Sequence, residues 1–547
     1  DGATYDLMQA WIDDGLMPTR GRLQAEGAWG PLRTVAPPIT APAWTSFKTG
    51  MNPARHGVFE FMYRVEGSYT LTPVNARRCG ARALWDLLGD AGQRVVVVNV
   101  PMTYPPHPVN GSMITGLFTP RGGNVWDVDF TYPPELRETL RQRYGRYVVH
   151  PTEVYARGQM DRMLQELSFA LERRTDVMLD LLEEEQPDFA MVVYNGTDKI
   201  GHALWHCLDP QHPFHDPAEA DQVGSAVPDY FQAVDRTLAR VLDAVGDDTY
   251  VALMSDHGMG PIYRFVYLNN WLLEEGYLRL RSDLPTRLKK IAFRLGITPI
   301  NVYDGLVKLG LARLRTKVNF APRERLLSRF FLSLSNVDWS QTRAYSLGNI
   351  GQIYLNVRGR EPEGIVERGA EYEAVREEMI AGLRQLRDPE TGTPIMTEIY
   401  RREELYDGPY MDEAPDIIML PHKLEYQAAG TSAFMHNHVL GLPRGNSGGH
   451  RMDGIWLLKG PGVQSGVRLE GAQITDLAPT LLHIHGLPVP EDMDGQVLHQ
   501  AFEAGSALDH PARRESNAWV GRGGDGQYSA EEEEEIYQRL ADLGYVT

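Results

Sequence analysis

The chain has 547 residues, and 54 Lys and Arg against 73 Asp and Glu give it a formal net charge of −19. This excess of negative charge disfavours a general polyanion-binding surface, so no nucleic acid polymer is expected as a partner. The two cysteines, Cys79 and Cys207, lie far apart and outside any C-x-x-C pattern. Neither a disulfide framework nor a thiolate zinc site is therefore indicated.

No run of about 18 apolar residues occurs, so no membrane span is predicted. No signal peptide is visible either, which favours a cytoplasmic location. The sequence opens at Asp1 without an initiating Met, and what precedes Asp1 stays open. Oligomeric state leaves no signal in the sequence.

Apolar runs that end at polar clusters alternate with helical patterns, as is typical of parallel βαβ units. In chain order they predict a strand at 94–100, a helix at 159–185, a strand at 188–194, a helix at 229–245, and strands at 249–255 and 454–460. Such Val-rich strands should be buried on both faces. The pattern predicts an α/β fold with a doubly wound, mostly parallel sheet, helices on both faces, and ligands outside the carboxyl ends of the strands.

Residues 264–345 interrupt this alternation and read as helices. Between 264 and 330 there are 14 Arg or Lys residues and 5 Asp or Glu residues, so the segment is basic within an acidic chain. It fits a solvated helical insertion. It also fits a helical cap that attracts an anionic substrate or touches an anionic membrane surface.

The remaining segments complete the predicted domain plan. Residues 361–419 read as helix, turn and short strand, a possible subdomain beside the core. The tail at 501–547 ends in a helix that begins at a Ser529 N-cap, with an acidic first turn. The catalytic core then consists of 1–263 and 346–500.

Acidic and imidazole groups gather at the predicted strand ends. Asp198 and His202 share one helical face at i, i+4 and can converge on a cation. Asp256 and His257 directly follow the strand at 249–255. Each pair alone would more often be a surface pair or a helix cap.

Two further groups complete the set. His450 precedes the strand at 454–460, where a lone His is usually structural. Asp1 lies where a first strand would end if the residues before it formed one, and otherwise it is simply a charged terminus. Four hydroxyls fall within residues 39–57: Thr40, Thr45, Ser46 and Thr49. Three carboxylates, three imidazoles and a hydroxyl are the inventory of a two-metal hydrolytic site.

The order of these motifs resembles a known family. Asp1, "PPITAPAWTSFKTGMNPARHGVFEF", "TDKIGH", "SDHGMG", "GGHRMDGIW" and "ITDLAPTLLHIHGLPVPEDMDG" are similar to the alkaline phosphatase superfamily, and within it to the type I phosphodiesterase and nucleotide pyrophosphatase family. The resemblance implies one metal held by Asp198, His202 and His450, and a second held by Asp1, Asp256, His257 and the nucleophile. Mixed nitrogen and oxygen ligands make Zn²⁺ the expected ion, with Mn²⁺ as the alternative.

The resemblance also implies that Thr40 is the nucleophile, because in the family this residue lies upstream of the "TG…P…HG" element. Pro42 suits an early helix position, which would place the Thr40 hydroxyl at the positive N-terminal end. Thr45 and Ser46 then fall inside that helix. The implied reaction on a small phosphate ester passes through a phosphothreonine intermediate that water hydrolyses.

Three residues bear on the substrate. Where nucleotide pyrophosphatases place a phosphate-contacting Asn, this chain has Phe61, so either Asn195 or Lys48 replaces that donor or the substrate is not a nucleotide. Trp44 stands where a sulfatase motif needs Arg, which disfavours a sulfatase. A phosphomonoesterase or mutase, and a non-catalytic metal-binding member of the fold, remain alternatives.

Overall fold

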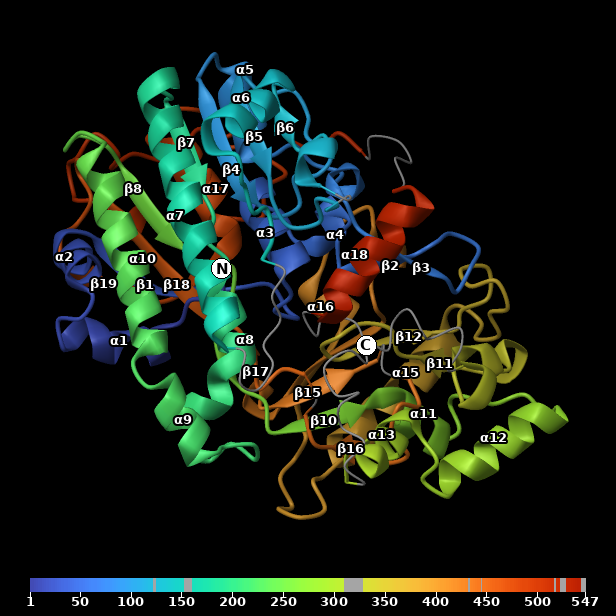
Figure 1. Cartoon of the computed structure of the whole chain (residues 1–547). Coiled ribbons are helices and arrows are strands. Elements are labelled where there is room, and N and C mark those ends of the chain that lie inside the picture. Colours follow the sequence, from blue (N-terminus) through green and yellow to red (C-terminus); the bar gives the residue numbers. More distant parts are fainter. Residues whose placement is uncertain are drawn as a thin grey trace.

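A computed structural model describes residues 1–121, 124–151, 160–308, 328–430, 433–443, 445–515, 518–521 and 528–542. The described chain is a mixed α/β structure with several sheets (Figure 1). All four predicted strands form: β4 (Val95–Val100), β7 (Phe189–Val192), β8 (Val251–Met254) and β18 (Asp453–Lys459). Both predicted helices form as well, as α7 (Met160–Glu185) and α10 (Ala226–Asp243).

The strands divide between two main sheets. One has the order β6–β5–β4–β7, where β5 (Gly111–Thr115) and β7 run parallel to β4 and β6 (Thr131–Tyr132) runs antiparallel to β5. The other has the order β19–β1–β18–β8, where β18 runs antiparallel to β1 (Ala28–Arg33) and to β8. Both β19 (Val467–Arg468) and β20 (Ala472–Gln473) pair with β1. A single doubly wound, mostly parallel sheet is therefore not confirmed.

Burial of the strands follows their place in each sheet. β4 is central in its sheet and buried along its whole length, between α7 and α5 (Leu84–Asp90). β7 and β8 stand at the ends of their sheets and are only partly covered. The expectation of burial on both faces is correct for β4 and wrong for β7 and β8, because an edge strand has a neighbour on one side only.

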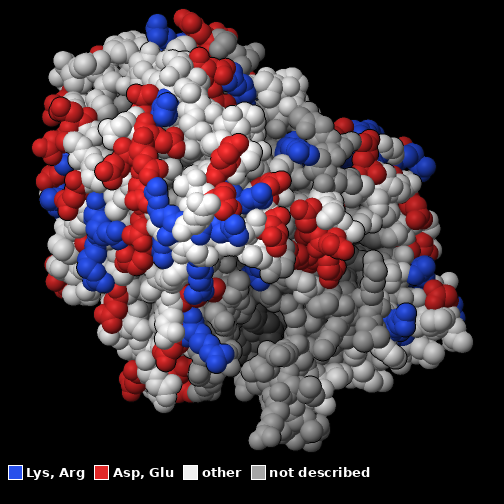
Figure 2. All heavy atoms as spheres, turned by 45° about the horizontal axis from the view of Figure 1, so that its top comes forward, with Lys and Arg blue, Asp and Glu red and all other residues white. Residues whose placement is uncertain are grey.

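Two long helices cover the sheets on one side. α7 and α10 run side by side in front of the strands in Figure 1. Arg240 joins them through ion pairs with Glu172 at 2.7 Å and Asp176 at 2.8 Å. Acidic and basic side chains lie interspersed over the face seen in Figure 2. The expectation that no nucleic acid polymer binds stays a prediction.

The segment predicted as a helical cap begins with a strand. β10 (Arg264–Tyr267) pairs with β15 (Tyr426–Ala429) and β16 (Leu440–Gly441), and α11 (Leu268–Glu274), α12 (Leu284–Arg294) and α13 (Pro299–Lys308) follow it. The rest of the basic segment, 309–327, lies outside the described residues. Three helices therefore form within 268–308, and β10 ties the segment to strands far along the chain. Its role as a cap stays a prediction.

The segment 361–419 shares a core with this cap. It contains α15 (Ala370–Gln385), β13 (Met396–Arg401) and the start of β14 (Ile417–Pro421). Met379 of α15 packs in the same apolar cluster as Trp271 of α11. The two segments therefore form one body, and the domain boundaries themselves stay a prediction.

The C-terminal helix packs onto the core. α18 (Ala530–Asp542) begins after Ser529, whose Oγ accepts a hydrogen bond from Glu532 N at 3.3 Å. Ile536 and Leu540 lie in one apolar cluster with Phe61. The predicted Ser529 cap is thus confirmed. Among the described helices, none is long and apolar enough to cross a membrane.

Gly448 allows two elements near the strand ends to approach closely. It begins β17 (Gly448–Arg451), and a Cβ atom there would lie 2.2 Å from the carbonyl oxygen of Gly201 in α8 (Gly196–Leu208). Backbone atoms of a packed helix cannot move away cheaply.

We therefore predict that Gly448→Ala lowers the free energy of unfolding by about 1–3 kcal/mol. Thermal denaturation followed by circular dichroism should show a lower midpoint. Gly305→Ala is the matched control, because Gly305 lies within α13 with no atom within 4 Å of the added Cβ. Equal midpoints for Gly448→Ala and the wild type would contradict the close approach.

Candidate active site

Thr40 is the first residue of α3 (Thr40–Thr49). The chain enters the helix in extended conformation at Ile39, and Pro42 lies in the first turn, where its missing N–H costs no helical hydrogen bond. Thr40 Oγ1 is buried and lies 3.1 Å from His257 Nε2. The hydroxyl thus stands at the positive end of the helix dipole.

The other three hydroxyls of this segment are engaged elsewhere. Thr45 Oγ1 donates to the carbonyl of Ala41 at 2.7 Å, and Thr49 Oγ1 donates to that of Thr45 at 2.7 Å. Ser46 Oγ lies 2.9 Å from His56 Nε2. Only the Thr40 hydroxyl is placed next to one of the predicted ligands.

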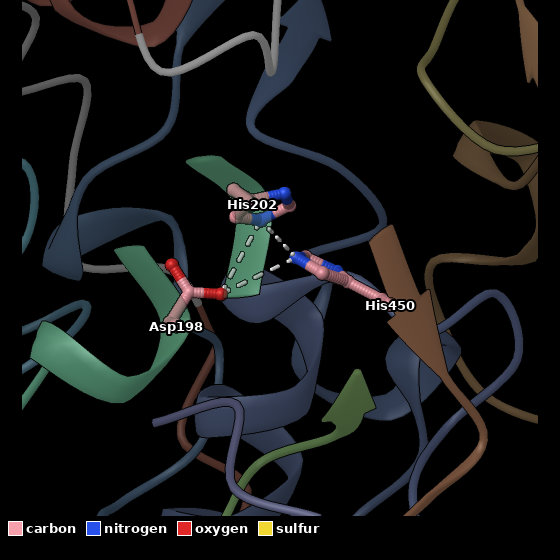
Figure 3. Close-up of side chains that lie close together, drawn as sticks. All are labelled: Asp198, His202 and His450. Atoms are coloured by element: carbon pink, nitrogen blue, oxygen red, sulfur yellow. Dashed lines mark hydrogen bonds and ion pairs between the residues drawn. The ribbon is translucent and has the colours of Figure 1, made fainter. Parts of the chain in front are cut away.

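Three predicted ligands meet between α8 and β17 (Figure 3). Asp198 and His202 lie one turn apart on α8, with Asp198 Oδ1 3.3 Å from His202 Nε2. His450 reaches them from β17, and its Nε2 lies 3.0 Å from His202 Nε2 and 3.7 Å from Asp198 Oδ1. All three side chains are buried. Their ligand atoms lie close enough together to hold one ion.

A two-stranded ladder places His257 beside this cluster. β9 (Gly258–Pro261) pairs antiparallel with β17, and His257 immediately precedes β9. The rings of His257 and His450 stack with centroids 3.5 Å apart and planes 19° apart. Two imidazoles that are distant in sequence thereby face one space.

Asp1 and Asp256 lie around His257. Asp256 Oδ2 is 3.1 Å and Asp1 Oδ1 is 3.9 Å from His257 Nε2. Gly2 N donates to Asp256 Oδ1 at 3.1 Å, and Thr197 Oγ1 donates to the carbonyl of Asp1. Gly2 has φ +62°, and a Cβ there would lie 2.9 Å from the Asp198 backbone, so only glycine fits.

The second group of ligand atoms differs from the predicted one. Asp1, Asp198 and His257 offer three atoms close enough to hold one ion. Asp198 therefore belongs to both groups, while Asp256 contacts the second group through His257. The structure brings all the predicted ligands into one buried region, and their division between two ions stays a prediction.

The donor set fits a cation. His202 Nδ1 lies 2.8 Å from the carbonyl oxygen of Gly448, and His450 Nδ1 lies 2.7 Å from that of Pro38. A carbonyl oxygen only accepts, so each Nδ1 carries a proton, and in the neutral ring each Nε2 presents a lone pair. With both rings neutral, two lone pairs and a carboxylate oxygen of Asp198 face the same buried space. A divalent cation satisfies all three.

His257 is oriented in the same way. Its Nδ1 donates to the carbonyl oxygen of Gly258 at 3.1 Å, and its Nε2 faces the carboxylate of Asp256. Burial alone would lower the pKa of the ring, but Asp256 raises it above its usual value. Asp1 Oδ1 is buried and has no hydrogen bond to any described residue. A buried carboxylate oxygen without a donor is costly unless a cation balances it.

Charges in the cluster shift its pKa values strongly. Burial alone would raise the pKa of Asp198, but His202 and Lys199 hold it well below its usual range. Burial, reinforced by His257 and His202, lowers the pKa of His450. Asp198 is thus an anion and His450 a neutral imidazole, which are the protonation states of metal ligands.

A comparison with known proteins agrees with this geometry. The sequence model of the type I phosphodiesterase/nucleotide pyrophosphatase family matches residues 1–433. The chain belongs to this family. It is thereby a member of the alkaline phosphatase superfamily and a phosphoester hydrolase by family.

Solved structures with a similar fold include phosphonoacetate hydrolase from Sinorhizobium meliloti 1021 in complex with phosphonoformate, at 16% identity and a TM-score of 0.50, covering 87% of this chain and 92% of that chain. Human ectonucleotide pyrophosphatase/phosphodiesterase 5 matches at 12% identity and a TM-score of 0.46, covering 89% and 93%. An inactive form of the murine protein in complex with AMP matches at 13% and 0.48, also covering 89% and 93%. No curated protein matches the chain.

The three residues considered for substrate binding in this family member have contacts elsewhere. Lys48 Nζ donates to the carbonyl of Met102 at 2.7 Å, and Asn195 Oδ1 accepts from Arg174 at 3.0 Å. Phe61 is 1% exposed and packs against Phe118. None of these contacts involves the ligand cluster. Their roles in substrate binding stay predictions.

Sequence reasoning missed three features of this phosphodiesterase-family site. Lys199 Nζ lies 3.3 Å from Asp198 Oδ2 and adds a cation beside the cluster. Its position next to Asp198 in the "TDKIGH" motif was a visible signal. The carbonyls of Pro38 and Gly448 orient two imidazoles, and no sequence pattern marks a carbonyl for that role.

The sequence also gave no indication that Glu60 would be a buried carboxyl group. It lies directly before Phe61, is buried, and accepts hydrogen bonds from Phe61 N at 2.9 Å and Asn349 N at 3.0 Å. It lines a cavity of about 60 Å³ together with Tyr345 and Gln352. Burial raises the pKa of Glu60 to about 7, and the hydrogen bonds from Phe61 and Asn349 oppose this only in part.

We predict that this carboxyl makes stability depend on pH. Between pH 4.5 and about 7 the folded protein keeps a proton on Glu60 that the unfolded chain releases, so stability falls as pH rises. Above about pH 7 the ionised Glu60 carboxylate lowers the free energy of unfolding by about 3 kcal/mol. Glu60→Gln should therefore raise the thermal midpoint at pH 8 but not at pH 5.

Glu66→Gln is the control, because it makes the same chemical change at an exposed position. Its midpoint should follow the wild type at both pH values. A Glu60→Gln midpoint that also follows the wild type at pH 8 would show that the buried carboxyl carries no such penalty.

Proposed function

We propose that the chain is a metal-dependent phosphodiesterase or nucleotide pyrophosphatase that acts on a small phosphate ester. One observation carries the proposal: the Thr40 hydroxyl, at the start of a helix, lies 3.1 Å from a His257 imidazole that stacks on His450 of the ligand cluster. The proposed nucleophile therefore lies in the same buried region as the proposed metal ligands and the N-terminal end of α3. Family membership supports the same class of reaction.

The ligands proposed for two divalent cations, Zn²⁺ or Mn²⁺, are Asp198, His202 and His450 for one, and Asp1, Asp256, His257 and Thr40 for the other. Bound cations supply Lewis acidity at the phosphoryl oxygens and neutralise charge on the leaving oxygen. Asp198 offers an oxygen within reach of both groups of ligand atoms.

The chain's own residues supply the nucleophile and its position. Thr40 Oγ1 attacks phosphorus, the P–O bond to the leaving group breaks, and a phosphothreonine forms. Water then hydrolyses this ester and restores the hydroxyl. The N-terminal end of α3 stabilises negative charge at Thr40 throughout, and burial of the site strengthens each of these electrostatic interactions.

We predict that Thr40→Ala lowers the kcat for bis(4-nitrophenyl) phosphate at least about a thousandfold, because the nucleophile is lost. Thr45→Ala is the matched control. It removes a hydroxyl from the same helix that is bonded to a helix carbonyl. This control should keep its activity.

Three outcomes would change the assignment. A Thr40→Ala protein with wild-type activity would exclude Thr40 as the nucleophile. A wild type that prefers 4-nitrophenyl phosphate to the diester would favour the phosphomonoesterase alternative. A metal-loaded protein without any activity would leave a non-catalytic metal-binding member of the fold.

We further predict that His450→Ala and His202→Ala each reduce the bound metal, because each removes one of three ligands of the same ion. Metal per protein is measured by inductively coupled plasma mass spectrometry after dialysis. His215→Ala is the control, since His215 Nδ1 bonds to the carbonyl of His206 at 2.8 Å and lies outside the ligand groups. Equal metal content in all four proteins would contradict the assignment.

A further inference from the structure

Helix α12 turns an apolar stripe toward solvent. The stripe consists of Leu284, Leu288 and Ile291 of α12 and of Leu295, which directly follows the helix; these side chains are 69%, 58%, 55% and 75% exposed. Their spacing of three and four positions places them on one helical face. A stripe of this kind normally faces a core, so its exposure needs an explanation.

The packing of α12 fixes this orientation. Phe293 is buried on the opposite face and meets Phe434 edge to face at 5.9 Å. Thr286 Oγ1, on the same buried face, accepts from Asn336 Nδ2 at 3.1 Å, and Asp283 caps the helix through Thr286 N at 2.9 Å. The face that carries Phe293 and Thr286 therefore anchors the helix to the protein. The opposite face, which carries the apolar stripe, points to solvent.

Further apolar side chains are exposed in the segments that follow α12 along the chain. Ile297 is 51% exposed, and Val302 and Leu306 of α13 are each 40% exposed, one helical turn apart. Phe330 is 68% exposed and lies near Ser328, whose carbonyl accepts from Lys289 of α12. In Figure 1, α12 projects at the lower right edge of the molecule, next to α13.

Positive charge flanks the stripe. Arg287, Lys290 and Arg294 of α12 form no ion pair with any described residue. Burial and then the neighbouring charges of Arg294 and Arg279 lower the pKa of Lys290, as expected where cations gather without acids. This cluster stands out in a chain whose net charge is −19.

We propose that α12 docks the protein on an anionic lipid surface, with the stripe of Leu284, Leu288, Ile291 and Leu295 inserted at the boundary between headgroups and acyl chains. An exposed apolar face flanked by unpaired Lys and Arg is the pattern of an interfacial helix. A second copy of the chain fits less well, because an isologous contact would bring the same basic residues of two chains together. The proposal does not depend on the proposed hydrolase reaction.

The test is co-sedimentation of the full-length protein with vesicles of phosphatidylcholine alone or of phosphatidylcholine with phosphatidylglycerol. We expect binding to the anionic vesicles, weakening as salt rises. Leu288→Glu with Ile291→Glu should lower the partition coefficient at least about tenfold. Each of Arg287→Gln and Arg294→Gln should lower it about fivefold at low salt.

Val520→Glu is the matched control, because Val520 is 62% exposed and lies in the segment beside Ala81, away from α12. It should bind vesicles like the wild type. All variants should hydrolyse a soluble diester and show a circular dichroism spectrum as the wild type does. A weaker binding to vesicles then reports a loss of docking and not a loss of folding or catalysis.

Three outcomes would overturn the proposal. The wild type could fail to bind anionic vesicles, or the Leu288→Glu, Ile291→Glu protein could bind as well as the wild type. Sedimentation velocity could also show a dimer that this double variant dissociates, which would identify a second copy as the occupant of the stripe.

Discussion

The orientation of three imidazoles constrains the whole site. Backbone carbonyls next to His202, His257 and His450 each accept a hydrogen bond from Nδ1, so every Nε2 faces the same buried region. The carboxylates of Asp198 and Asp256 face these Nε2 atoms. Buried carboxylates are favourable only beside positive charge, which protonated imidazoles or a bound cation can supply.

Two helices point their N-terminal ends at this region. α3 begins with Thr40, and α8 begins at Gly196 and carries Asp198 in its first turn. A phosphoryl group between them would meet two positive dipole ends besides the bound cations. The antiparallel pair β9 and β17 supplies the remaining imidazoles, so short loops and rigid elements, rather than one long loop, position the reacting groups.

Catalysis and surface docking use different parts of the chain. The site is built mainly from segments before residue 263 and from β17, while α12 belongs to the basic segment after β10. The acidic residues that give the net charge of −19 lie mixed with basic ones over the face seen in Figure 2. A local positive patch on a negatively charged protein favours one orientation toward an anionic surface.

The sequence by itself determined the local features: the four strands, the helices α7 and α10, and the shared face of Asp198 and His202, because backbone periodicity alone fixes them. Family motifs added the ligand set. Only the tertiary structure decided features that hydrophobic periodicity does not encode. Examples are the contact of His202 with His450, 248 positions apart, and the antiparallel pairing of β18 with β8. It also turned the stripe of α12 outward, because hydrophobic spacing fixes which residues share a face, whereas packing partners fix where that face points.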